Sequence, residues 1–178
     1  TMDHYLEIGG SAGDDVSALW ARRRRRVEPA VAAIEAALVP SHVDPVPPNI
    51  LVTGADDATT VRFVDWEYSA PAAPIWDLAD FAIEAELAPQ EETTLLGAYA
   101  GRDAGRIDAA YRVYKPLLDL LAAAWAASQM ALPGRRREHE PLLRKRLGRA
   151  RAGLDAPGYD ALLETAARQG CGIAPAGH

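Results

Sequence analysis

The residues best suited to chemistry form an H-x-D-x4-N pattern, made by His42, Asp44 and Asn49, with Asp65 further along the chain. A carboxylate can orient an acceptor hydroxyl and take its proton, while an amide and a second carboxylate can hold Mg²⁺ between nucleotide phosphates. We therefore predict that Asp44 is a catalytic base and that Asn49 and Asp65 are metal ligands. The H-x-D-x4-N pattern alone is weak evidence for this chemistry, and its position beside two strand-like runs strengthens the prediction.

The elements that must position these residues are a β-hairpin and a helical body. Residues 49–53 and 61–65 are short β-branched runs, and the turn-forming residues 54–57 separate them, which predicts a hairpin. This is the only β-structure that the sequence predicts. The fold class is therefore mainly α with a small hairpin (α+β), in one domain spanning residues 1–178.

Helices are expected in most of the remaining sequence. One should begin at Val16, and another should begin at Pro29 and end before Pro40. The clearest helix covers residues 106–131, where apolar side chains recur at helical spacing on one face and Pro116 should introduce a kink. Further helices are expected over residues 76–87, 91–100, 138–152 and 159–169. Residues 1–14 and 170–178 should be flexible.

Composition narrows the class of protein. The net charge of −6 argues against nucleic acid as a partner, despite arginine runs at 22–26 and 135–137. No apolar run approaches the roughly 20 residues of a membrane span. The first residues do not resemble a secretory signal, and the single cysteine, Cys171, suits a reducing compartment. We expect a cytoplasmic location.

Three segments resemble a known family. They are Asp65-Trp66-Glu67-Tyr68-Ser69, Pro74-Ile75-Trp76-Asp77-Leu78-Ala79, and residues 112–120 with Trp125 and Gln129. Together they are similar to the choline/ethanolamine kinase branch of the aminoglycoside-phosphotransferase-like (protein-kinase-like) family, over about residues 39–129. The resemblance implies a kinase-like C-lobe that uses ATP and Mg²⁺. It also implies a phosphoryl acceptor such as choline, ethanolamine or a similar cationic alcohol.

The resemblance also implies roles around the catalytic loop. His42 should support the loop through a backbone hydrogen bond, and Val43 stands where relatives often have Asn. Asp77 resembles a carboxylate that accepts hydrogen bonds from the loop backbone, although it could instead cap the following helix. Glu67 is either a further metal ligand or a charge at the exit of the hairpin.

The acceptor site should contain aromatic and acidic side chains, because a quaternary ammonium binds both. Trp125 resembles one of two tryptophans on the substrate-side helix of the family, and Ala122 stands at the position of the other. Trp125 also lies on the apolar face of the expected helix, and a packed core tryptophan is the commoner explanation for such a residue. Glu84 is a possible partner for the cation or a solvated helix residue, and Tyr68 either joins the site or packs the hairpin onto the helices.

The part of the family fold that covers ATP is not recognisable in this sequence. Such kinases have a β-rich N-lobe with a phosphate-binding lysine, whereas Lys115 and Lys145 both follow the catalytic loop. The sequence therefore predicts a C-lobe without an N-lobe. Another chain could supply the N-lobe. The alternative is a non-catalytic, truncated module for binding or interaction, which could self-associate through its uncovered face. The reading frame upstream of Thr1 would separate these hypotheses.

Overall fold

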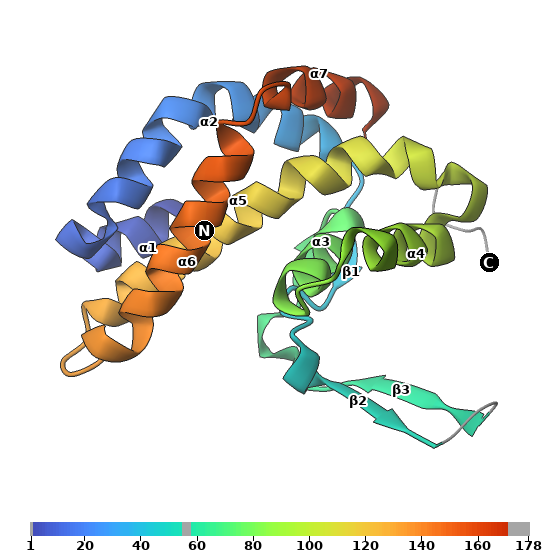
Figure 1. Cartoon of the computed structure of the whole chain (residues 1–178), viewed down its shortest axis with the longest axis horizontal. Coiled ribbons are helices and arrows are strands. Elements are labelled where there is room, and N and C mark those ends of the chain that lie inside the picture. Colours follow the sequence, from blue (N-terminus) through green and yellow to red (C-terminus); the bar gives the residue numbers. More distant parts are fainter. Residues whose placement is uncertain (1, 55–57, 171–178) are drawn as a thin grey trace.

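A computed structural model describes residues 2–54 and 58–170, in which helices surround the long helix α5 (Ala104–Met130) (Figure 1). The other helices are α1 (Met2–Gly9), α2 (Asp14–Ile34), α3 (Ile75–Glu84), α4 (Pro89–Ala100), α6 (Arg136–Leu154) and α7 (Tyr159–Gln169). Helix α5 packs against all six of them. The mainly helical class is therefore confirmed.

Two small antiparallel sheets accompany the helices. Strand β2 (Ile50–Thr53) pairs with β3 (Thr60–Phe63) in the predicted hairpin, which extends away from the helical body (Figure 1). Strand β1 (Val39–Ser41) pairs with β4 (Ala70–Ala72), and the sequence did not predict this pair. Each of these strands has only three residues and contains a proline, so neither shows a periodic pattern. Their pairing brings the residues after β1 close to the start of α3.

Helix α5 is more deeply buried than one apolar face would require. The predicted stripe is correct in part, since Tyr111 and Tyr114 are 1% and 2% exposed. Small side chains on the other faces of the helix are buried as well, namely Ala109, Ala110, Ala123, Ala124, Ala126 and Ala127. Alanine gives little contrast in a hydrophobic pattern, yet it lets neighbouring helices approach closely. The single-face prediction was therefore too narrow.

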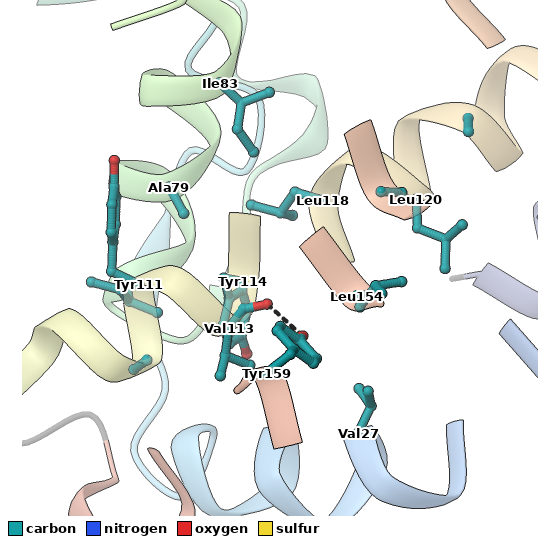
Figure 2. Close-up of a cluster of buried hydrophobic side chains, with 14 of the residues drawn as sticks. Val27, Ala79, Ile83, Tyr111, Val113, Tyr114, Leu118, Leu120, Leu154 and Tyr159 are labelled. Atoms are coloured by element: carbon teal, nitrogen blue, oxygen red, sulfur yellow. Dashed lines mark hydrogen bonds between the residues drawn. The ribbon is translucent and has the colours of Figure 1, made fainter. Parts of the chain in front are cut away.

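The core lies where α5 meets α2, α3, α6 and α7 (Figure 2). Leu154 of α6 and Val27 of α2 are almost completely buried there. The Tyr159 hydroxyl donates a hydrogen bond of 3.0 Å to the main-chain oxygen of Val113, which satisfies a polar group in an otherwise apolar cluster (Figure 2).

Two prolines lie inside helices. The sequence predicted that α2 would break near Pro29, and this was wrong, because α2 is continuous from Asp14 to Ile34. Val27, Ala30 and Ile34 are buried on both sides of the proline, and their packing offsets the one hydrogen bond that proline cannot donate. Helix α5 is likewise one element across Pro116.

The first residues form a helix where a flexible segment was expected. Helix α1 is followed by a 3₁₀ turn, Gly10–Gly13, and Tyr5 and Leu6 pack against the core. A Cβ on Gly9 would lie 3.1 Å from the Cβ of Ala127, so the glycine allows α1 to end directly on α5. The expected flexible segment at the other end falls on residues 171–178, outside the described residues, and on Gly170. None of the described helices is both long enough and apolar enough to span a membrane.

Candidate active site

A pocket of about 410 Å³ lies among α1, α3, α5, α6 and the loop that follows β1. It brings together four residues of the predicted site, Asp44, Tyr68, Glu84 and Trp125. Its other lining residues are Tyr5, Val43, Val46, Trp76, Asp80, Leu118, Leu121, Ala122, Leu142 and Arg146. Most of this lining is apolar or aromatic, with three carboxyl groups and one guanidinium among it. Such a pocket suits a small ligand with one charged end.

The loop that carries Asp44 is held by the first turn of α3. Asp77 accepts hydrogen bonds of 2.8 Å from the main-chain N–H groups of both His42 and Val43. The indole of Trp76 donates a hydrogen bond of 3.2 Å to the main-chain oxygen of Val43. Asp77 is the third residue of α3 and Pro74 is the N-cap, so the N-cap interpretation of Asp77 is wrong. The backbone contact that the resemblance implied is present.

Val43 has an unusual backbone conformation. Its φ is +71°, in the left-handed region, where a β-branched residue is strongly disfavoured. Asn and Asp tolerate this region far better than a β-branched residue does. The hydrogen bond that Val43 donates to Asp77 and the one that it accepts from Trp76 hold Val43 in this conformation.

His42 connects the same loop to the hairpin. Its side chain is 3% exposed, and its Nε2 lies 2.9 Å from the main-chain oxygen of Val64. Since a carbonyl oxygen only accepts, Nε2 must carry the proton. The imidazole also packs against the Trp66 ring, with centroids 4.6 Å apart. The expected backbone hydrogen bond of His42 is therefore present, and it fixes the end of β3 against the loop.

Asn49 lies beside Asp44. Its side-chain amide donates hydrogen bonds to the main-chain oxygen of Asp44 at 3.1 Å and to Asp44 Oδ2 at 3.2 Å. No described residue donates a hydrogen bond to Asn49 Oδ1. Its main-chain oxygen accepts a hydrogen bond of 2.9 Å from the N–H of Val64, the residue before Asp65. The loop that carries Asp44, the side chain of Asn49 and the end of β3 are thus connected by hydrogen bonds.

Asp65 and Glu67 are exposed at the exit of the hairpin. Asp65 has a φ of +63° and precedes a short 3₁₀ turn, Trp66–Tyr68, and its carboxylate makes no hydrogen bond or ion pair with a described residue. Within residues 2–54 and 58–170, no group of three or more His, Cys, Asp or Glu side chains could hold a metal ion. The uncommitted oxygens of Asn49 and Asp65 are hard donors that fit Mg²⁺, and phosphate oxygens would have to complete its coordination.

An ion network that joins three helices reaches the pocket through Glu84 and Arg146. Arg146 of α6 is 5% exposed and contacts Asp119 of α5 at 3.0 Å and Glu84 of α3 at 2.5 Å. Arg149 adds a contact of 3.1 Å to Asp119. Glu84 is therefore not a solvated helix residue, because it lines the pocket and is paired with a buried guanidinium.

Asp80 is a pocket residue that the sequence analysis missed. It lies one turn before Glu84 on α3, and the i, i+4 spacing of the two acids was the available signal. Burial raises the pKa of Asp80 to about 8, and the nearby carboxylates Glu84, Asp44 and Asp77 add to this effect, whereas Arg146 opposes it.

Trp125 both lines the pocket and packs against the protein. Its ring meets the His139 imidazole edge-to-face, with centroids 5.3 Å apart. Tyr5, which the sequence analysis placed in a flexible segment, lines the pocket from α1, and Tyr68 lines it from the end of the hairpin while remaining 50% exposed. Ala122 lines the pocket as well. The expected cation site therefore lacks the second tryptophan that the resemblance implied at this position.

Two comparisons with known proteins found a match for this chain. Residues 9–117 match the phosphotransferase enzyme family (APH). The structure resembles that of a choline/ethanolamine kinase family protein from Mesorhizobium loti, with a TM-score of 0.74 and 28% sequence identity. That alignment covers 94% of this chain and 57% of the other protein, so the present chain spans little more than half of that relative. No curated protein matches the chain.

The match to residues 9–117 includes the loop that carries Asp44, the hairpin and α3. The chain belongs to the phosphotransferase enzyme family. Membership implies ATP and a divalent metal ion in general terms.

Proposed function

We propose that this chain carries the acceptor site and the catalytic loop of a phosphotransferase that moves the γ-phosphoryl group of ATP to the hydroxyl of a small cationic amino alcohol. One observation carries the proposal. Asp44 lines the same pocket as Trp125, Glu84 and Asp80, so a cation held by the acidic and aromatic residues would present its hydroxyl near a carboxylate.

In this proposal Asp44 orients the hydroxyl and accepts its proton as the new P–O bond forms. The hydrogen bond from Asn49 to Asp44 Oδ2 fixes the rotation of the carboxylate. Mg²⁺ would be held by Asn49 and Asp65, and when bound it would neutralise the charge on the phosphates. Glu67 is a candidate for a further ligand, since it lies two residues after Asp65 at the same end of the hairpin.

The structure of the loop favours positioning as the main source of catalysis. His42 and Asp77 hold the loop from two sides, through Val64 at the end of β3 and through the first turn of α3. Positioned groups lower the barrier because they lose little orientational freedom in the transition state. We propose that His42 and Asp77 act in this way, without touching the substrate.

Neither lysine of this chain is available as the phosphate-binding lysine that such enzymes use. Lys115 is paired with Glu92 at 2.5 Å, and Lys145 is paired with Glu86. Both ammonium groups are therefore already neutralised by carboxylates. We propose that the cationic partner of the ATP phosphates comes from a lobe or chain beyond these 178 residues, as the 57% coverage of the relative allows.

The second candidate function is a non-catalytic binding module. The exposed apolar residues of the hairpin favour it, since Val52, Val61 and Trp66 are each more than half exposed. Such a surface could contact another lobe or another chain.

An assay of ATP consumption on the protein that the complete reading frame encodes separates the two functions. With Mg²⁺ present, we expect ADP release that depends on an amino alcohol, and mass spectrometry should detect the phosphorylated amino alcohol. If the rate of ADP release does not depend on choline, ethanolamine or aminoglycosides, and no phosphorylated product forms, the phosphotransferase proposal is wrong. The non-catalytic binding module is then favoured.

A further inference from the structure

Asp80 and Glu84 occupy the same face of α3 but differ in their partners. Glu84 is bound to Arg146 at 2.5 Å, and Arg146 is also bound to Asp119. Asp80 lines the pocket without a hydrogen bond or ion pair to any residue that the structure describes. Glu84 is thus largely neutralised by a guanidinium, whereas the carboxyl group of Asp80 is left for a ligand.

We propose that Asp80 binds the cationic end of the acceptor and that it selects ammonium groups that carry at least one N–H bond over quaternary ammonium groups. This inference rests on the proposed function, because it assumes that the pocket binds an amino alcohol. It differs from the expectation drawn from the sequence, in which Glu84 was the partner of the cation.

The chemistry of a half-buried carboxylate supports the selection. A carboxylate in a mostly apolar pocket is costly unless hydrogen-bond donors satisfy its oxygens. A primary, secondary or tertiary ammonium can donate such a bond, and a charge-assisted hydrogen bond is stronger than a neutral one. A quaternary ammonium has no N–H and depends on aromatic faces instead. Here Ala122, and not a second aromatic residue, lines the pocket one turn before Trp125, so the pocket offers a quaternary ammonium fewer aromatic faces.

The groups around Asp80 also predict a proton coupling. The carboxylates of Glu84, Asp44 and Asp77 and the guanidinium of Arg146 act on it, and Tyr5 and Tyr68 line the same pocket. With a pKa of about 8, Asp80 is mostly protonated at pH 7 when no ligand is bound. An ammonium ligand favours the ionised form, so its binding should release a proton.

The test is a calorimetric titration of the 178-residue chain with four amino alcohols that differ by one methyl group each. They are ethanolamine, N-methylethanolamine, N,N-dimethylethanolamine and choline. The first three carry N–H bonds and choline carries none, while dimethylethanolamine is close to choline in size. We expect affinity to fall most sharply at the last methylation, by about tenfold or more, since one charge-assisted hydrogen bond is lost at that step.

The isosteric variant Asp80→Asn assigns the effect to this side chain. It should weaken the three N–H ligands by about tenfold to a hundredfold and change choline binding by less than about threefold. Glu86→Gln is the matched control, because it also removes one acidic charge just beyond α3 but Glu86 does not line the pocket. It should leave all four affinities unchanged.

Proton release gives an independent readout. Titrations of ethanolamine at pH 7 in two buffers of different ionisation enthalpy should show proton release for the wild type and none for Asp80→Asn. Between pH 6 and pH 8 the wild-type affinity should rise by up to about tenfold per pH unit, since binding releases one proton, while the affinity of the variant stays flat.

The outcomes separate this inference from the proposed function. If amino alcohols bind but choline binds as tightly as dimethylethanolamine, or if Asp80→Asn weakens all four ligands equally, the role of Asp80 is refuted while the acceptor site stands. If the folded wild-type chain binds none of the four, the amino alcohol proposal fails, and the role of Asp80 fails with it.

Discussion

Asp77 accepts a hydrogen bond of 2.8 Å from the main-chain N–H of Val43, a residue whose φ of +71° lies in the left-handed region. The carboxylate therefore stabilises a backbone conformation that the side chain of Val43 opposes. Asp44 is the next residue, so the direction of the candidate base depends on this contact. The strained residue and the carboxylate that supports it therefore lie beside the candidate base, where we propose that positioning contributes most to catalysis.

Val43→Asn is expected to stabilise the protein. A β-branched residue in the left-handed region costs about 1–2 kcal/mol, and Asn tolerates that region, so the free energy of unfolding should rise by about 1 kcal/mol. Urea unfolding measures the change. The control is Val52→Asn on the exposed strand β2, which should be neutral or slightly destabilising. A loss of stability in Val43→Asn would show that the conformation is not strained.

Asp77→Asn is expected to loosen the loop that carries Asp44, the candidate base. An amide has only one oxygen, and its NH₂ group would face a main-chain N–H, so one of the two hydrogen bonds is replaced by an unfavourable contact. The expected cost is about 1–3 kcal/mol, the usual range for a donor left unsatisfied. Amide hydrogen exchange should accelerate at His42 and Val43 more than in α7. Unchanged exchange at both positions would contradict the role of Asp77.

Asp80→Asn is expected to stabilise the ligand-free protein at high pH. The folded-state pKa of about 8 lies above the ordinary value of 3.8, so the stability linked to this group is fully present below about pH 4 and is lost as pH rises through 8. Asparagine cannot ionise and avoids that loss. The variant should match the wild type at pH 4 and exceed it by about 1–3 kcal/mol at pH 9. A difference that does not change with pH would mean that Asp80 ionises normally.

Gly153→Ala is expected to disrupt the packing of α6 on α5. An added Cβ would lie 2.6 Å from the Cβ of Pro116, which belongs to a rigid ring, so the helices would have to separate. The expected cost is about 1–3 kcal/mol, as for other overpacked sites. Gly148→Ala, also in α6, meets nothing within 4 Å and should be neutral or stabilising, because alanine favours a helix. Equal effects at the two positions would be inconsistent with this close approach.

Helix periodicity and turn residues predicted much of the fold. The bounds of α7 and the long course of α5 follow directly from apolar spacing and from the glycines and prolines that end those segments. Helix α1 was missed because the glycines at residues 9, 10 and 13 resemble a loop, whereas Gly9 ends the helix in close contact with Ala127 of α5. The continuity of α2 was missed because proline usually ends a helix, and only tertiary packing explains the exception.

The candidate site was predictable where its residues are close in sequence or match a family pattern. Asp44, Tyr68, Glu84 and Trp125 do line one pocket. The contribution of Tyr5 could not be foreseen, since it depends on how α1 docks. That Glu84 is ion-paired and Asp80 is not could not be foreseen either. It depends on Arg146 of α6, which pairs with Glu84.

The most direct test of the central claim is the turnover number of Asp44→Asn in the protein that the complete reading frame encodes. It should be measured at saturating Mg²⁺, ATP and ethanolamine, with Asp108→Asn as a control outside the pocket. We predict a loss of about 10²–10⁴-fold, the usual contribution of a general base, with little change in ethanolamine affinity. Asp108→Asn should retain wild-type turnover. An Asp44→Asn variant that turns over within a few-fold of the wild type would contradict the account.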